Sequence, residues 1–479
     1  MVVKHPHVVA DGVVAPSPLP AEGSGAFSNL HLALAVIITP KLIQWTFPIL
    51  NHSRIIYFIL LAITFFPVLI GYWTLTSTFG GRINDKVQLP GRPIGHYLEF
   101  KDEEVRKKYL GRKIPYQELH DLYFEGKIDF KGDVLEVLEY RHDFVTFNFT
   151  PELFKYVFFT FAPEVILHSQ SQDEEQVRGH YDRGDDFYEW FLGPRMIYTS
   201  GVISDITRPE TLEELQDNKL KLVCEKLDLQ PTDKLLDIGC GWGTLVAFAG
   251  KNYKCDVTGV TLGINQTKFG TERLRENGVP EDRGRILCTD YRFIDPIPQS
   301  FTKIVSLEMA EHVGIRKYSS FLRQVYDLLD DDGTFVFQVA GIRPSWQFED
   351  LQWGLFMNKY VFPGADASIP LWWVLKEVEA VGFEVKQVDV LGVHYSATIY
   401  RWYQNWISNK EKVLAKYGDR WFRIWSFFLA SSTIVSRQGS ASVFQITLHK
   451  NLNAYKRVEG VPTHIGIHYD KAKEFSLVQ

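Results

Sequence analysis

Short apolar runs alternate with helical patterns through the second half of this chain. Runs of the length of buried strands occur at 234–238, 256–261, 285–289, 302–307 and 334–339. Between them, apolar positions recur at helical spacing, beginning at Thr244, near Ile264 and at Tyr318. Strands that alternate with helices are typical of α/β proteins, so this pattern predicts a doubly wound, mostly parallel sheet.

Two long apolar segments precede this region. Residues 55–75 are a 21-residue run without a charge, which is long enough to cross a bilayer as a helix. Residues 30–50 are interrupted by Pro40, Lys41 and Pro48, so they either close a hairpin as a second span or enter the membrane without crossing it. A buried hairpin of a soluble protein is the alternative.

The flanking charges predict an orientation for these segments. Seven basic residues lie between positions 82 and 108, and positive-inside logic places everything after the spans in the cytosol. We therefore expect a membrane protein, at the endoplasmic reticulum or another endomembrane, whose α/β unit faces the cytosol.

Changes in composition divide the chain into five parts. These are a disordered terminus (1–28), two apolar transmembrane or re-entrant segments (29–78), a mixed membrane-proximal region (79–170), the α/β unit with lipid-binding insertions (171–450) and a polar tail (451–479).

The overall composition narrows the class of protein further. The net charge is −6 without a basic block, which argues against a nucleic-acid partner. The four cysteines form no C-x-x-C pair and are expected to be reduced thiols. Aromatic residues make up 14% of the chain, which indicates a lipid-facing surface, an apolar channel or a heavy core. Residues 151–167 are especially aromatic, and they either lie on a membrane face or pack as a core helix.

The first predicted strand ends in a glycine-rich turn, Gly239-Cys240-Gly241-Trp242-Gly243, and a helix follows. This arrangement forms a ligand crevice in open α/β sheets. The spacing matches neither the dinucleotide fingerprint G-x-G-x-x-G nor a P-loop. A tight turn with no ligand is the alternative.

Four stretches, taken together, resemble a known family. They are HYDRGDDFYEWFLGPRMIY (180–198), LLDIGCGWGT followed by VTLGINQ, the triplet at 290–292, and LEMAEHVG (307–314). In this order they resemble the cyclopropane-fatty-acid-synthase-like family of S-adenosylmethionine-dependent methyltransferases, which includes the mycolic acid methyltransferases. The apolar N-terminus and the stretch FVFQVAGIRPSW look most like the fungal sphingolipid C9-methyltransferases within it.

The resemblance implies a Rossmann-like sheet that binds S-adenosylmethionine. The second strand ends without the acidic residue that commonly binds ribose hydroxyls, and Gln266 is a suitable substitute because an amide both donates and accepts. The implied cofactor residues are Tyr198, Thr199, Leu236, Asp237, Ile238, Gly239, Cys240, Gly241, Trp242, Gly243, Thr244, Thr261, Leu262, Gly263, Ile264, Asn265, Gln266, Asp290, Tyr291 and Arg292.

The resemblance also implies a bicarbonate ion that acts as the base, held by a Glu, a His, a Tyr and the backbone around a Cys. This sequence keeps Glu311 and Tyr395, but it has Gln338 in place of the His and Ser200 in place of the Cys. These departures put the bicarbonate site in question, because an amide cannot take up the proton. A water or a carboxylate is then the alternative base, with Glu311 the first choice and Glu308 the second.

Three further motif residues are candidate catalytic groups: His180, Tyr181 and His312. The histidines are alternatively polar groups at helix ends. We expect no metal site, because no other His, Cys or acid accompanies them at ligand spacing.

The resemblance to the fungal sphingolipid C9-methyltransferases implies methylation at C9 of a Δ8-unsaturated sphingoid base, in ceramide or glucosylceramide. The alkene would attack the sulfonium methyl, and proton loss from the resulting carbocation would restore the double bond. The alternatives are cyclopropanation or methylation of a phospholipid acyl chain, and a non-catalytic protein that binds the cofactor or lipid. The oligomeric state is left open.

Overall fold

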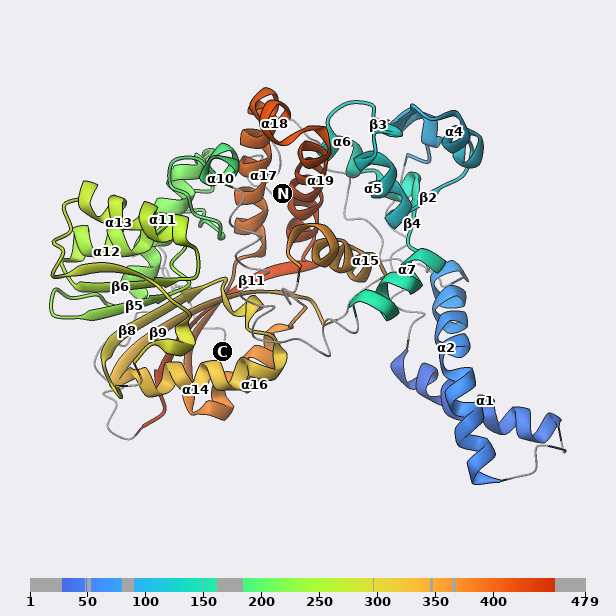
Figure 1. The fold of residues 1–479 in the computed structure, drawn as a ribbon, viewed down its shortest axis with the longest axis horizontal. Helices are drawn as coiled ribbons and strands as arrows, with labels where there is room; N and C mark the ends of the chain where they lie inside the picture. The colour runs from blue at the N-terminus through green and yellow to red at the C-terminus, as the bar shows by residue number, and fades with distance from the viewer. Residues whose placement is uncertain are drawn as a thin grey trace, which may run out of the picture.

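The structure is a computed structural model that describes residues 28–47, 49, 53–79, 90–148, 150–161, 184–295, 297–344, 348–363 and 368–452. An α/β unit, a smaller N-terminal unit and a helical hairpin make up these residues (Figure 1). The sequence predictions for the N-terminal tail, for residues 171–183 and for the C-terminal tail beyond residue 452 lie outside the described residues.

A seven-stranded sheet forms the centre of the α/β unit, in the order β10-β11-β9-β8-β5-β6-β7. Five strands run parallel: β5 (Lys234–Ile238), β6 (Asp256–Thr261), β7 (Gly284–Cys288), β8 (Phe301–Leu307) and β9 (Leu329–Ile342). β11 (Ala441–Lys450) is antiparallel to both β9 and β10 (Phe383–Val390). The predicted mostly parallel sheet is therefore confirmed, with β9 longer than its apolar run.

Helices cover both faces of this sheet (Figure 1). On one face lie α11 (Leu212–Lys226), α12 (Thr244–Tyr253) and α13 (Ile264–Glu276), and on the other lie α14 (Tyr318–Leu328) and α16 (Leu371–Val381). The amphipathic pattern of α14 shows why it packs there: its residues 318, 321, 322, 325 and 328 are buried at helical spacing.

The aromatic surplus of the sequence forms a large core beside the sheet. It is built by α10 (Asp185–Leu192), α15 (Phe348–Phe356), α17 (Gly392–Ser408), α18 (Lys410–Tyr417) and α19 (Asp419–Arg437). Trp402, Trp406 and Trp425 are completely buried in it. Phe187 of α10 packs edge-on against Trp425, with ring centroids 4.9 Å apart. Much of the aromatic excess is thus a heavy core, one of the three interpretations of the composition.

The N-terminal unit packs on this core. Its elements are α3 (Ile94–Tyr97), β1 (Leu98–Phe100), α4 (Glu103–Tyr109), β2 (Ile114–Pro115), α5 (Tyr116–Phe124), β3 (Ile128–Phe130), α6 (Val134–Leu138), β4 (Val145–Thr146) and α7 (Pro151–Tyr156). One hydrophobic cluster contains buried residues of both α5 and α19, so the two units share a core. A π-helical turn, Val157–Phe161, follows α7.

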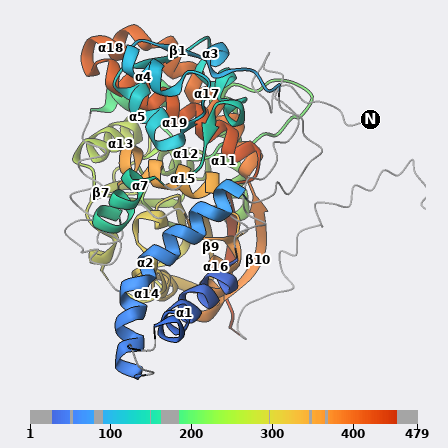
Figure 2. The ribbon, with the colours of Figure 1, turned by 90° about the vertical axis from the view of Figure 1, so that its right-hand side faces the viewer.

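The two apolar segments form a hairpin of α1 (Asn29–Thr46) and α2 (Arg54–Phe79), seen from a second side in Figure 2. The Ser28 backbone N–H donates to the Tyr72 hydroxyl at 3.0 Å, and the Gln44 side chain donates to the Ser53 carbonyl at 3.1 Å. Each contact joins the beginning of one helix to the end of the other, so the two helices run antiparallel. By length and composition alone, Arg54–Thr76 is the one helix among the described residues that meets the criteria for crossing a membrane; α1 does not.

Candidate cofactor and catalytic site

A cavity of about 180 Å³ lies at the carboxyl ends of β5, β6 and β8, which is where open α/β sheets bind their ligands. Most of the predicted cofactor residues line it: Tyr198, Thr199, Asp237, Ile238, Gly239, Cys240, Gly241, Trp242, Thr244, Thr261, Leu262, Gln266, Asp290, Tyr291 and Arg292. The others, Leu236, Gly243, Gly263, Ile264 and Asn265, are not part of its wall. Ile264 and Asn265 are instead exposed at the start of α13.

The glycine-rich turn gives this cavity its floor. The N–H groups of Gly239 and Cys240 both donate to the Val260 carbonyl, at 2.9 and 3.0 Å, which ties the turn to β6. Gly239 has φ 84°, and a Cβ on it would lie 2.6 Å from the Met309 Cγ. Gly241 has φ 54°, and a Cβ on it would meet nothing within 4 Å. The turn thus requires glycine and leaves room for a ligand to approach the backbone.

Polar groups at the ends of β6 and β7 complete the opposite wall. The Thr261 hydroxyl donates to Gln266 Oε1 at 2.6 Å. The oxygen of this amide is thus used as an acceptor, and its N–H groups point away from Thr261 as donors. Asp290 accepts hydrogen bonds from the N–H and the Nε of Arg292, both at 2.9 Å. These groups suit a ribose and an adenine, so the site fits the predicted cofactor.

Lys219 is a cavity residue that the sequence analysis missed. Its ammonium donates to the Thr199 hydroxyl at 2.7 Å, and the neighbouring Gln216 donates to the Thr199 carbonyl at 2.9 Å. Burial lowers the pKa of Lys219 to about 8, although the charges of Glu308 and Asp237 oppose this shift. The available signal was a Gln and a Lys within the apolar stripe of α11, where leucines and valines otherwise occur.

Asp237 faces the same cavity from the end of β5. Burial raises its pKa to about 7, and the positive charge of Lys219 partly offsets that effect. A buried carboxylate and a buried ammonium are therefore paired electrostatically beneath the cofactor region.

Four of the predicted catalytic residues meet at a single carboxylate, that of Glu308. Its Oε1 accepts the Ser200 N–H at 2.9 Å and the Gln338 side-chain amide at 2.6 Å, and Tyr395 also hydrogen-bonds to it. Burial raises the pKa of Glu308, whereas these hydrogen bonds and Lys219 act in the opposite direction. Glu308 lines the cavity.

Glu311 occupies a different position. A helix that began at Glu308 would have put Glu308 and Glu311 on one face, but no helix begins there. Glu308 has φ 53° and precedes the 3₁₀ turn Ala310–His312 that contains Glu311. Glu311 accepts the Ala340 N–H and is absent from the cavity wall. Burial, and then the charge of Glu308, raise its pKa to about 8.

The remaining catalytic candidates are His312, His180 and Tyr181. His312 lines the cavity, and burial lowers its pKa to about 4, so its ring is neutral at physiological pH. His180 and Tyr181 lie outside the described residues.

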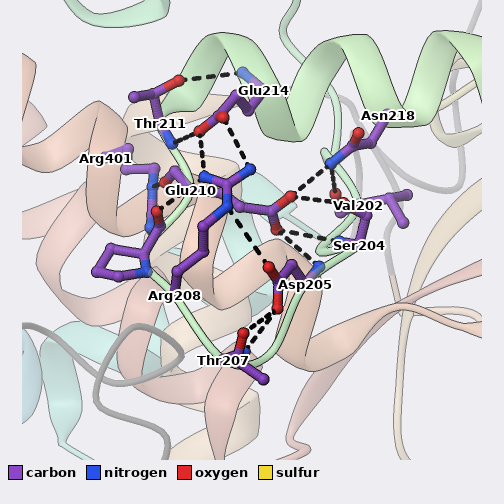
Figure 3. Close-up of polar contacts among 11 residues, drawn as sticks. Val202, Ser204, Asp205, Thr207, Arg208, Glu210, Thr211, Glu214, Asn218 and Arg401 are labelled. Atoms are coloured by element: carbon purple, nitrogen blue, oxygen red, sulfur yellow. Dashed lines mark hydrogen bonds and ion pairs between the residues drawn. The ribbon is translucent and has the colours of Figure 1, made fainter.

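A polar network holds the loop between Val202 and Thr211, which follows Ser200 along the chain (Figure 3). In this network, the Glu210 carboxylate accepts the hydroxyl of Ser204 at 2.6 Å and the side-chain amide of Asn218 at 2.9 Å. The Arg401 guanidinium donates to the Glu210 carbonyl at 2.6 Å. This network joins the loop to α11 and α17.

The strand order, the glycine-rich turn and the residues around the cavity define an S-adenosylmethionine-dependent methyltransferase. Residues 168–446 match the family described as Mycolic acid cyclopropane synthetase, and the chain belongs to this family.

Relatives match the chain over nearly its whole length. Sphingolipid C9-methyltransferase 2 of Gibberella zeae is 58% identical over 94% of this chain and 87% of its own length. Sphingolipid C9-methyltransferase of Komagataella phaffii is 56% identical over 94% of both chains.

Solved structures match the α/β unit. The cyclopropane synthase MmaA2 from Mycobacterium tuberculosis is 28% identical, with a TM-score of 0.55 over 58% of this chain and 98% of that chain. The mycolic acid cyclopropane synthase CmaA1, complexed with SAH and CTAB, is 29% identical, with a TM-score of 0.54 over the same shares.

Proposed function

We propose that this enzyme methylates C9 of a Δ8-unsaturated sphingoid base within ceramide or glucosylceramide, at a membrane. One observation carries the proposal: relatives named sphingolipid C9-methyltransferase match about 94% of the chain, which includes sequence outside the catalytic unit. The α/β unit alone would support only lipid or small-molecule methylation, because that unit is common to the solved structures.

S-adenosylmethionine supplies an electrophilic methyl group on a sulfonium ion. The residues of this chain would hold it over the glycine-rich turn, with Gln266 and Asp290 at the nucleoside end and Tyr198 near the reacting end. The C8–C9 double bond would supply the electron pair of the new C–C bond at C9, leaving a cation at C8. A nearby carboxylate and the ring of Tyr198 would stabilise that cation.

Loss of the proton from C9 would then return its C–H electron pair to C8–C9 and restore the alkene with a methyl branch. Loss of a proton from the added methyl group would instead close a cyclopropane. The position of the base therefore decides the product, and the carboxyl groups of Glu308 and Glu311 are the candidates near the cavity.

The N-terminal hairpin supports membrane attachment. The most apolar window of α2 has no buried residue, and its large apolar side chains Ile55, Phe58 and Ile63 are 64–73% exposed. The ammonium of Lys41 lies over the ring of Tyr57, 5.2 Å from its centroid, which lowers the cost of a charge beside the apolar surface. The proposal places the catalytic unit on the cytosolic side, since basic residues follow α2.

The test uses purified protein in lipid nanodiscs, Δ8-unsaturated glucosylceramide and S-adenosylmethionine with a fully deuterated methyl group. A branched product keeps all the methyl deuterium, whereas a cyclopropane loses one deuterium atom. Mass spectrometry therefore separates two products that have equal mass without the label. The proposal predicts full retention together with a surviving double bond.

Other outcomes contradict the proposal in different ways. Loss of one deuterium atom would assign cyclopropanation. Transfer to a phospholipid acyl chain, with none to the sphingolipid, would assign the alternative substrate. Binding of the cofactor without transfer to either lipid would favour the non-catalytic function.

A further inference from the structure

Glu308 occupies a backbone conformation that needs an explanation. It follows β8 directly with φ 53°, in the left-handed region that glycine tolerates and glutamate disfavours. Its own N–H donates to the Gln338 carbonyl at 2.7 Å, so β9 holds it in place. Strained residues persist where the surrounding structure fixes them, and they are concentrated at functional sites. This conformation places the carboxylate on the cavity wall.

The carboxylate is surrounded by hydrogen-bond donors. The Ser200 N–H and the Gln338 amide donate to one oxygen, and Tyr395 interacts with the group as well. Lys219 adds a favourable charge interaction. Burial raises the pKa of Glu308, and these donors, together with Lys219, oppose that shift because they stabilise the ionised carboxylate.

A chain of side chains fixes the direction of the Gln338 amide. The Lys226 ammonium donates to Gln445 Oε1 at 2.5 Å, and Gln445 Nε2 donates to Gln338 Oε1 at 2.7 Å. Gln338 Nε2 then donates to Glu308. An ammonium can only donate, so Lys226 determines which end each glutamine presents to the next group.

The elements of the sheet bring this chain together. Gln338 and Gln445 are direct partners in the register of β9 and β11, and both are completely buried. Lys226 ends α11, and it also pairs with Asp389 of β10. An amide flip at Gln338 would set its carbonyl oxygen against the carboxylate, and the chain from Lys226 opposes such a flip.

We propose that Glu308 is the base that removes the C9 proton, and that Lys226, Gln445 and Gln338 form an amide chain that positions it. This inference rests on the proposed function. The C9–H bond breaks, its electron pair restores the C8–C9 double bond, and the proton passes to a Glu308 oxygen. The carboxylic acid returns the proton to solvent after the product leaves.

The structure ranks Glu308 before Glu311, the reverse of the order suggested by the sequence. Glu311 is not on the cavity wall. Burial raises the pKa of both carboxyl groups, but only Glu308 has side-chain partners that lower it: the amide of Gln338, the hydroxyl of Tyr395 and the ammonium of Lys219.

The test compares two matched variants, Glu308→Gln and Glu311→Gln, which make the same chemical change three residues apart. Glu308→Gln should lower kcat at least about a hundredfold, a typical contribution of a general base, while Glu311→Gln should lose less than about tenfold. Calorimetry should show that both variants bind S-adenosylmethionine with affinity within about threefold of the wild-type protein. The opposite ranking of kcat, or a fully active Glu308→Gln, overturns the proposal.

A second variant distinguishes the loss of a base from a structural defect at position 308. Glu308→Gly relieves the left-handed backbone and leaves space among the donors, so added formate should restore part of its turnover without increasing that of the wild-type protein. Failure of formate to restore turnover in a variant that still binds the cofactor contradicts the role of the carboxylate.

The pH dependence of kcat tests whether Lys226, Gln445 and Gln338 position Glu308. Lys226→Met removes the donor that sets the amide direction, and Lys226→Arg keeps one. Loss of the Gln338 hydrogen bond should raise the pKa of Glu308, on which Ser200, Lys219 and Tyr395 also act. The acidic limb of the kcat profile should therefore move to higher pH in Lys226→Met and stay in place in Lys226→Arg. Identical profiles in the two variants would refute the chain.

The wild-type protein separates the two proposals. If it methylates an acyl chain of a phospholipid in place of the sphingolipid, the proposed function fails, and the same variants test Glu308 on that product. If it methylates the sphingolipid and Glu308→Gln is fully active, only the assignment of the base fails.

Discussion

Trp73 of the apolar helix α2 lies against Phe348, the first residue of α15, with ring centroids 5.0 Å apart. The Trp73 side chain is only 8% exposed, although the most apolar window of the same helix is not buried at all. The last turns of α2 are therefore bound to the catalytic unit, while the rest of the helix projects from it (Figure 2).

This contact predicts energetic coupling between the hairpin and the catalytic unit. Trp73→Ala and Phe348→Ala should each destabilise the protein, and together they should cost about 1 kcal/mol less than the sum of the single changes. Denaturant unfolding in detergent measures this double-mutant cycle. Leu75, which is 59% exposed, provides the control: Leu75→Ala should combine additively with Phe348→Ala. Coupling of equal size in both cycles would contradict a specific Trp73–Phe348 contact.

The glycine-rich turn predicts a specific loss of cofactor binding. Gly239→Ala places a Cβ 2.6 Å from the Met309 side chain in a residue with φ 84°. We expect affinity for S-adenosylmethionine to fall at least about tenfold, because the turn must shift. Calorimetry measures this change. Gly278→Ala is the matched control, since Gly278 has φ 70° but nothing lies within 4 Å of the added Cβ; unchanged binding in both variants would refute the close approach.

A buried ion pair joins the N-terminal unit to α15. Arg141 donates to Glu349, and His142 lies 3.0 Å from the same carboxylate. Arg141→Met leaves that carboxylate without its main partner, and it should lower the free energy of unfolding by about 3–5 kcal/mol. Chemical unfolding of the full chain is the measurement.

The control for this ion pair is an exposed one. Arg106 pairs with Glu103 at 3.5 Å on the surface of α4, so Arg106→Met should cost less than about 1 kcal/mol. The double change Arg141→Met with Glu349→Leu should recover part of the lost stability, because no uncompensated charge then remains. Equal costs for Arg106→Met and Arg141→Met would mean that the buried pair is unimportant.

Glu311 predicts a pH dependence of stability. Its pKa rises from 4.5 to about 8 on folding, through burial and the charge of Glu308, so the folded state binds a proton that the unfolded state releases. Its contribution is complete below about pH 4.5 and is lost as the pH rises to about 8. Glu311→Gln should therefore flatten the decline in stability over this range, as measured by urea unfolding at several pH values.

Glu379 on α16 is exposed, and Glu379→Gln serves as the control for that series. Its decline with pH should match that of the wild-type protein. A decline that is equally steep in Glu311→Gln would show that Glu311 does not carry this dependence.

Local sequence predicted much of the sheet because strands buried on both faces are continuous apolar runs. Residues 234–238 and 256–261 were predicted with the observed bounds of β5 and β6. The turn after β5 was also predicted, because its run of glycines is typical of a tight turn, and in the structure these glycines have positive φ. The sequence predicted a spanning helix less clearly for residues 30–50 than for residues 55–75, because Pro40 and Lys41 interrupt the apolar pattern.

The sequence did not predict the partners of the buried charges. Arg141 and Glu349 are 208 residues apart, and Lys226 and Gln445 are 219 residues apart. Nothing in the local pattern around Gln445 distinguishes a buried relay from an ordinary polar residue in a strand. Lys219 was visible in principle as a cation on an apolar helix face, but its neighbours Asp237 and Glu308 become apparent only after folding.

The sequence by itself predicted the fold class and the cofactor turn from local spacing, and its motif order, through the family resemblance, pointed to most of the polar residues around the site, although not to Lys219. Only the tertiary structure decided which carboxylate faces the cavity. Glu308 and Glu311 are three residues apart and chemically alike, but the left-handed backbone at Glu308 turns the chain between them. Donors from β9, α17 and the segment after α10 then converge on Glu308, whereas Glu311 accepts the Ala340 N–H away from the cavity wall.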